Sequence, residues 1–405
     1  MNTVENIKKQ KFLGKTGTVL FIILMNMFIP LSTDLYLPAL PTMSSHFNAS
    51  ASLINLTLVS FFFFFAFGTI FLGPFCDKYG RRKVLILSSA LYMLASACCA
   101  LAPNVYVMII ARILQGISAG GIISASTVLV KDCFAGRQRE TILAVVQSAA
   151  GVAPMLAPVL GALLLKITDW RGAFEVLTVA GFVCLVLSLL YQETLPAEER
   201  LQESAFASLG KLVKVGKNKG FILPCIIFSL YNFAFMGYIS VSSYIYVDFF
   251  GLSEQMYSYF FAANALLSLL GPIIYVRFLA KGAKQKLVYT CFTVYLVAGA
   301  ILLLFGQLMP LLFWIGFAPF TFCGALIRPF SFNLLLDQQE GDTGSASSLL
   351  NGIFTVVGSI GMMSVSLFSN GVLGLGSVVF VSGLISLLAW TLLMRSKITI
   401  IGLND

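Results

Sequence analysis

The chain has 405 residues, of which 58% are hydrophobic and only 11% are charged, and its formal net charge is +9. A soluble protein usually carries about 25% charged residues. The composition therefore excludes an ordinary water-soluble globular protein and indicates that much of the surface faces lipid.

Twelve apolar runs along the chain are each long enough to cross a hydrocarbon layer of about 30 Å. We expect helices, because an isolated strand leaves its backbone polar groups unsatisfied in lipid. The runs cover residues 17–40, 53–75, 84–103, 105–129, 141–166, 172–191, 221–247, 255–279, 287–306, 310–335, 344–369 and 372–394. The sequence thus predicts an all-α polytopic membrane protein.

The basic residues lie almost entirely on one side of these spans. With an even number of spans both termini share a side, and that side holds 22 of the 26 Lys and Arg residues, beginning with Lys8 and Lys9. The other side holds Lys166 and Arg171. By the positive-inside rule we expect cytoplasmic termini, some affinity for anionic lipid and no nucleic-acid binding. Basic residues ahead of a long first span also argue against a cleaved signal peptide.

An acid in the first span, Asp34, lies about six residues from the expected outer end of that span. Arg112 lies about seven residues inside the fourth span, so both sit roughly 10 Å below the outer interface. Placing a charged side chain at the bilayer centre costs about 2.5–3.5 kcal/mol, so we expect each of these two residues to have a function or a compensating partner. A carboxylate whose surroundings alternate between a cavity and water can load and release a proton near neutral pH. We expect Asp34 and Arg112 to couple protons to transport; a static ion pair, a snorkelling acid or a structural arginine are the alternatives.

The loop between the second and third spans carries a specific motif. Its glycines permit a tight turn, and its acid can pair with adjacent cations or cap a helix. The pattern G-x-x-x-D-[KR]-x-G-R-[RK] is formed by Gly73, Asp77, Gly80, Arg81 and Arg82. It resembles the signature of the major facilitator superfamily, which implies two six-helix halves and a cytoplasmic latch. We expect Asp77 and Arg81 to form that latch with Asp132; the alternative is that the cations only anchor the topology.

Three further stretches resemble proton-coupled drug exporters, namely the bicyclomycin and chloramphenicol resistance (Bcr/CflA) and MdfA-like carriers. They are "STDLYLPALPTM" in span 1, "ARILQGISAGG" in span 4 and "GVAPMLAPVLG" in span 5. The last approximates an antiporter-type motif through Gly151, Pro154, Pro158 and Gly161. Some members carry a second acid earlier in span 1 where this chain has Asn26, which disfavours coupling to more than one proton.

A polar segment at residues 192–220 divides the chain into an N-terminal six-helix half, 1–191, and a C-terminal half, 221–405. This layout is typical of carriers built from two related halves with a substrate site near the midplane. We expect a wide amphipathic cavity lined by polar, aromatic and basic side chains. The candidates are Asn26, Tyr36, Tyr231, Asn232, Phe235, Tyr238 and Arg328. Arg328 either binds an anionic group of a cargo or faces a water-filled cavity or a carbonyl.

These features together predict a monomeric, proton-coupled exporter of amphipathic small molecules in the bacterial inner membrane, working by alternating access. Without a Walker sequence, a catalytic Ser/His/Asp set, Cys-x-x-Cys pairs or more than one histidine, we expect no enzyme activity, cofactor or metal site. An exporter of an endogenous metabolite, such as a small metal chelator or sugar, is the main alternative. An importer and a non-transporting receptor or scaffold are more distant ones.

Overall fold

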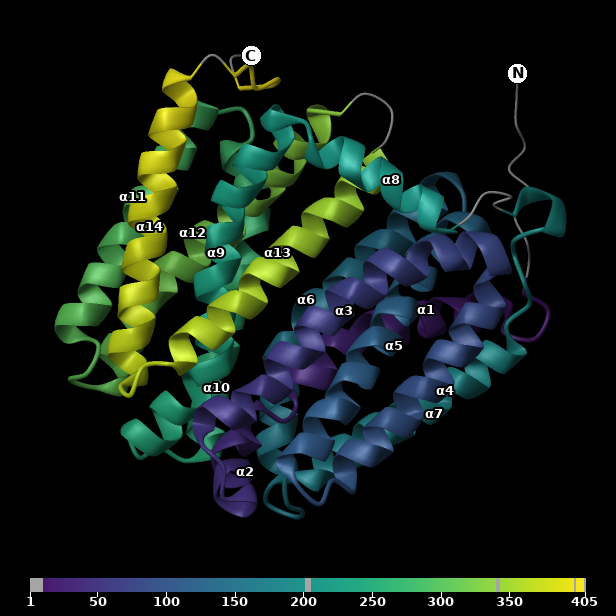
Figure 1. The fold of residues 1–405 in the computed structure, drawn as a ribbon, viewed down its shortest axis with the longest axis horizontal. Coiled ribbons are helices and arrows are strands. Elements are labelled where there is room, and N and C mark those ends of the chain that lie inside the picture. Colours follow the sequence, from purple (N-terminus) through teal and green to yellow (C-terminus); the bar gives the residue numbers. More distant parts are fainter. Residues whose placement is uncertain (1–9, 201–204, 340–342, 397, 404–405) are drawn as a thin grey trace. The chain divides into compact units, whose positions relative to one another are not determined.

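The protein is described from a computed structural model that covers residues 10–200, 205–339, 343–396 and 398–403. Twelve helices in this part of the chain are long and apolar enough to cross a membrane, which confirms the predicted number of spans (Figure 1). The predicted basic residues Lys8 and Lys9 and positions 201–204 of the predicted linker lie outside the described residues.

The first span is broken into three pieces, and two later spans end in a π-helical turn. The first half contains α1 (Gly14–Asp34), η1 (Leu37–Ala39), α2 (Leu40–Phe47), α3 (Ala51–Tyr79), α4 (Arg81–Ala100), α5 (Val105–Cys133), α6 (Gly136–Leu164) and α7 (Arg171–Leu190). The linker contains η2 (Ala197–Glu199) and α8 (Ala205–Gly216). The second half contains α9 (Lys219–Ser243), η3 (Tyr244–Phe249), α10 (Glu254–Ile274), η4 (Tyr275–Leu279), α11 (Lys284–Phe305), α12 (Pro310–Asp337), α13 (Thr343–Ser366) and α14 (Gly371–Arg395).

Local sequence explains where several helices begin. Asn104 caps α5 by accepting a hydrogen bond from the Val107 amide at 3.0 Å, and Asn370 caps α14 in the same way. Such side chains satisfy amides that have no partner inside the helix. Between α3 and α4 the chain turns at Gly80, whose φ of +96° favours glycine.

The chain forms two compact units, which are described separately. The first contains residues 1–36 and 60–209, and the second contains residues 37–59 and 210–405. The change between them falls inside the predicted linker, and the end of the first span groups with the second unit. One reason is hydrogen bonding, because Tyr244 donates to the Leu40 carbonyl and Ser52 donates to the Ser366 carbonyl.

The same order of helix pairing occurs in both units. In the first, α1 packs on α6 and α4 on α7, and glycines bring α3 against α5. In the second, α9 packs on α13, α10 on α12 and α11 on α14 (Figure 1). Within each set of six spans the first therefore pairs with the fifth, the second with the fourth and the third with the sixth. This repetition is weak in the sequence but clear in the contacts.

Glycine makes the closest of these contacts possible. A Cβ on Gly116 of α5 would meet the Phe61 carbonyl of α3, and a Cβ on Gly120 would meet the Thr69 amide. Helices in lipid associate through such close backbone approach, because apolar burial gives little driving force there.

Candidate functional site

The acid predicted in the first span lies at the last residue of α1, where the helix breaks before η1. Asp34 is buried, with 5% of its surface exposed, and its carboxylate accepts a hydrogen bond of 2.9 Å from the Thr33 hydroxyl. Pro30 lies one turn earlier, inside α1. A carboxylate at a helix break inside a membrane span is costly to keep there without a role.

Arg112 of α5 is fully buried and holds the end of α1 through the backbone. Its Nη1 donates to the Ser32 carbonyl at 2.9 Å and to Gln115 Oε1 at 2.5 Å. The guanidinium also lies over the rings of Phe61 and Tyr36, at 4.3 Å and 4.9 Å from their centroids. Arg112 therefore holds the segment two residues before Asp34, and its guanidinium lies among a carbonyl, an amide and aromatic faces.

A polar chain extends this arrangement to α4. Gln115 donates to Ser96 at 2.7 Å, and the hydroxyls of Ser32 and Tyr92 are hydrogen-bonded to each other. Ser32, Tyr92 and Ser96 were not among the functional residues predicted from the sequence. The only available signal was the four-residue spacing of Tyr92 and Ser96 in an otherwise apolar helix, which places both on one face.

The antiporter-type motif lies on α6 and touches the same break. A Cβ on Gly161 would collide with the carbonyl of Leu35, the residue that follows Asp34. Pro154 and Pro158 lie inside α6, and Gly151 lies one turn before Pro154. The structure thus brings Asp34, Arg112 and Gly161 around one short segment of α1. Asn26 lies about two turns before Asp34 in α1, and its side chain donates to the Ser126 hydroxyl of α5 at 2.7 Å.

The predicted latch residues are brought together at the other end of the first unit. Arg81 forms ion pairs with Asp77 at 3.2 Å and with Asp132 at 3.3 Å. Arg81 is buried, whereas about half of the Asp77 side chain is exposed. Gly73 lies in α3 one turn before Asp77. Arg82 extends away from the pair, and its Nη2 donates to the Leu189 carbonyl.

Glu193 completes this cluster, although it was not among the residues predicted from the sequence. Its carboxylate accepts hydrogen bonds from the amides of Arg81 and Arg82, at 3.1 Å and 3.0 Å. These are the first two residues of α4, so Glu193 caps the helix and complements its positive end. Thr194 donates to Asp132 at 2.7 Å and connects the two acids. The signal was the position of Glu193 as the first acid after the sixth span.

In the second unit, a small recess opens among α9, α11, α12 and α13, with room for about one water molecule. We call it the Arg328 recess; three predicted cavity residues, Tyr231, Asn232 and Arg328, line it together with Tyr295 and Phe354. Part of the Arg328 side chain is exposed. Asn232 donates to the Phe354 carbonyl at 3.3 Å.

The other predicted cavity residues lie elsewhere. Phe235 stacks on Tyr231 with ring centroids 5.4 Å apart, directly behind the Arg328 recess. Tyr238 is buried against Phe317, at 4.3 Å between centroids. Tyr36 is buried in the first unit, between Arg112 and Phe174. Of the aromatic candidates, Tyr231 alone contributes to the lining of the Arg328 recess.

Comparisons with known proteins show what the chain is similar to. The family profile described as "Major Facilitator Superfamily" matches residues 22–362. An "Uncharacterized MFS-type transporter YdgK" from Bacillus subtilis is 31% identical, over 91% of this chain and 93% of its own length. A "Bicyclomycin resistance protein homolog" from Haemophilus influenzae is 24% identical, over 85% of this chain and 88% of its own.

Two further comparisons extend this picture. A "Multidrug resistance protein MdtM" from Escherichia coli O157:H7 is 26% identical over 86% of this chain and 87% of its own. Among solved structures, a D-xylose-proton symporter superposes with a TM-score of 0.69 at 16% identity, covering 91% of this chain and 96% of its own. At that identity the likeness concerns the fold alone.

Proposed function

Because this chain belongs to the major facilitator superfamily, and is therefore a multi-pass membrane transporter and not an enzyme, we propose that it exports amphipathic small molecules in exchange for protons. The proposal places it in the inner membrane with cytoplasmic termini and has it work by alternating access. Its relatives include proteins named for bicyclomycin and multidrug resistance, which supports export of drug-like compounds.

The observation that carries the proton-coupling proposal is the position of Asp34. It is a buried acid at a break in α1. The backbone on one side of it is contacted from α5, where Arg112 donates to the Ser32 carbonyl. The backbone on the other side is contacted from α6, where Gly161 lies against the Leu35 carbonyl. A movement of either helix changes the surroundings of the carboxylate and with them its preference for a proton. Arg112 acts as a positioning residue in this scheme, since it holds the backbone next to Asp34.

The cytoplasmic latch has a matching physical basis. Arg81 is shared by Asp77 and Asp132, and α4 is capped by Glu193 from the start of the linker. These ion pairs and caps form only when the ends of the helices are in one particular arrangement. They therefore stabilise that arrangement over others. We take this cluster to stabilise one conformation of the transport cycle.

The test compares the wild type with Asp34→Asn in a host that lacks its major efflux pumps, across a panel of antibiotics. Wild-type resistance to at least one drug and its loss in Asp34→Asn are expected, because an amide side chain, unlike a carboxyl group, does not take up and release a proton near neutral pH. Asp169→Asn is the control, since Asp169 is exposed and pairs with Arg171 at the start of α7.

In proteoliposomes, drug movement driven by a pH gradient is expected in the wild type and not in Asp34→Asn. Full resistance in the variant would remove Asp34 from the proton pathway. Indifference of both strains to every drug would instead favour export of an endogenous metabolite.

A further inference from the structure

Arg328 is a cation well inside α12 that forms no ion pair with an acid in the described part of the chain. It lies nine residues before the last residue of the helix, Asp337. Among the residues that the structure describes, no ion pair involves Arg328, and its guanidinium lies 5.5 Å from the centroid of the Phe332 ring. A charge at such a position normally has a partner, because leaving it unpaired in the bilayer interior is costly.

The comparison with Arg112 makes the difference clear. Arg112 is fully buried, and its guanidinium is enclosed by a carbonyl, an amide and aromatic rings. Arg328 instead keeps part of its side chain exposed in a recess. The first arginine is built into the packing of its unit, whereas the second remains available to something that enters the recess.

Neighbouring side chains add hydrogen-bond donors at the same place. The Tyr295 hydroxyl has no partner among the described residues, although Tyr295 is only 1% exposed. An unmet buried hydroxyl costs free energy, which an acceptor entering the recess would recover. Tyr231 also lies within electrostatic range of the Arg328 guanidinium. The described side chains that line the recess include one cation and no anion.

Aromatic side chains form a large part of the lining of the recess. The ring of Tyr231 stacks between Phe235 and Tyr295, at 5.4 Å and 6.0 Å between centroids. It can occupy this position because residue 324 is glycine, where a Cβ would overlap the Tyr231 ring. The recess has room for about one water molecule. It can therefore admit a single small group, such as the carboxylate at one end of a molecule, but not a whole drug-sized ligand.

We propose that the Arg328 recess binds the carboxylate end of an aromatic, amphipathic cargo molecule. Arg328 pairs with the carboxylate, the Tyr295 hydroxyl donates to it, and the rings of Tyr231, Phe228 and Phe354 contact the adjoining apolar part. The assignment rests on the proposed transport function and specifies the substrate class that it would carry.

The experiment measures equilibrium binding of 2-naphthoate and of its neutral analogue 2-naphthamide to the detergent-purified full-length protein at pH 7, without any gradient. Naphthoate is expected to bind at least about tenfold more tightly, the effect of one charge-assisted hydrogen-bonded pair. In Arg328→Gln the affinity for naphthoate should fall to that for naphthamide, while naphthamide binding stays unchanged. Arg277→Gln is the control, because it removes an exposed arginine from η4 of the same unit.

Two further arms keep the outcome clear. Arg328→Lys should retain part of the preference for naphthoate, and Tyr295→Phe should weaken naphthoate binding while the ring remains in place. These variants also serve if Arg328→Gln fails to elute as a folded monodisperse protein. Added phosphatidylglycerol should not displace naphthoate; displacement would assign the recess to a lipid phosphate and overturn the proposal.

Equal affinities for naphthoate and naphthamide, or a preference that survives Arg328→Gln, would also overturn it. Because binding is measured without a gradient, such a failure leaves the proton-coupled drug resistance of the wild type untouched. Conversely, the Asp34→Asn comparison measures gradient-driven export and does not depend on naphthoate binding. The two proposals can therefore fail separately.

Discussion

Arg112 and Arg328 each lie several residues inside a long apolar helix, and their surroundings give them different physical roles. Arg112 donates two hydrogen bonds from one nitrogen and stacks on two rings, so the planar shape of the guanidinium is used as well as its charge. A lysine has a point charge on a flexible stem and cannot reproduce that set of contacts.

We therefore predict that Arg112→Lys lowers stability and transport together. Loss of a buried charge-assisted hydrogen bond costs about 1.5–3 kcal/mol, which should lower the midpoint of thermal unfolding by several degrees. The measurement is thermal unfolding of the purified protein, followed by drug transport at a temperature where both proteins are folded.

Arg171→Lys is the matched control, since Arg171 pairs with Asp169 at the surface, where an exposed pair contributes about 0–1 kcal/mol. Equal unfolding midpoints for Arg112→Lys and the wild type would show that the contacts of Arg112 are replaceable.

At the scale of helices, the decisive contact is that of α6 with the break that follows α1. Gly161 lies directly against the Leu35 carbonyl, so the backbone of α1 and the face of α6 are in van der Waals contact beside Asp34. No side chain fits between them, and the distance between the two helices is set by the absence of a Cβ.

Gly161→Ala is predicted to displace the end of α1 and to impair transport strongly. Overpacking a close contact costs about 1–3 kcal/mol, and here the neighbouring atom is backbone, which cannot rotate away. The measurement is gradient-driven transport per correctly folded protein in proteoliposomes. Gly344→Ala in α13 is the control, because a Cβ there meets nothing within 4 Å and alanine favours the helix. Normal transport by Gly161→Ala would contradict this prediction, because it would show that the end of α1 can move away from α6 without loss of function.

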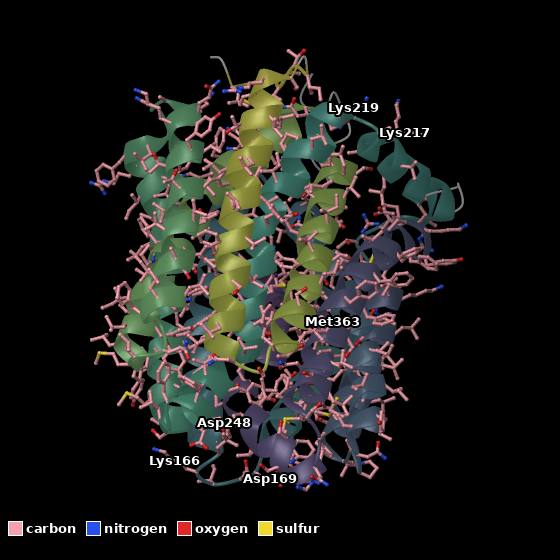
Figure 2. All side chains as sticks on the ribbon, turned by 60° about the vertical axis from the view of Figure 1, so that its left-hand side comes forward. Lys166, Asp169, Lys217, Lys219, Asp248 and Met363 are labelled. Carbon is pink, nitrogen blue, oxygen red and sulfur yellow. The ribbon has the colours of Figure 1, made fainter. Side chains whose placement is uncertain are left out.

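At the scale of the whole molecule, the charge distribution determines how the chain crosses the membrane. In the second unit, Lys217 and Lys219 lie at one end and Asp248 at the other, as Figure 2 shows. The long helix formed by α9 and η3 joins these ends and supplies a span of 31 residues. The basic end is expected to face the cytoplasm.

This topology predicts the labelling pattern of cysteine reporters in a background without native cysteines. A membrane-impermeant maleimide should react with Asp248→Cys and Asp169→Cys in intact cells, and with Lys217→Cys only after permeabilisation. All three positions are exposed, so differences in reactivity report the side of the membrane. Labelling of Lys217→Cys in intact cells would place the linker outside and reverse the predicted orientation.

The sequence by itself determined the membrane-embedded class, the twelve spans and the family. These follow from the hydropathy and length of local segments and from motifs such as the one around Asp77 and Arg81, all of which are properties of short stretches. The pairing of Arg81 with Asp77 could also be predicted from the sequence, because the two residues are only four positions apart.

Only the tertiary structure decided which distant polar groups meet. Glu193 reaches the start of α4 from 112 residues away, and Arg112 reaches the Ser32 carbonyl from 80 residues away. Likewise, Tyr295 and Arg328 come together in one recess, while Tyr36 and Tyr238 are buried elsewhere. In lipid every apolar face is nearly equivalent to every other, so hydropathy determines where a helix lies but small residues and hydrogen bonds determine its neighbours.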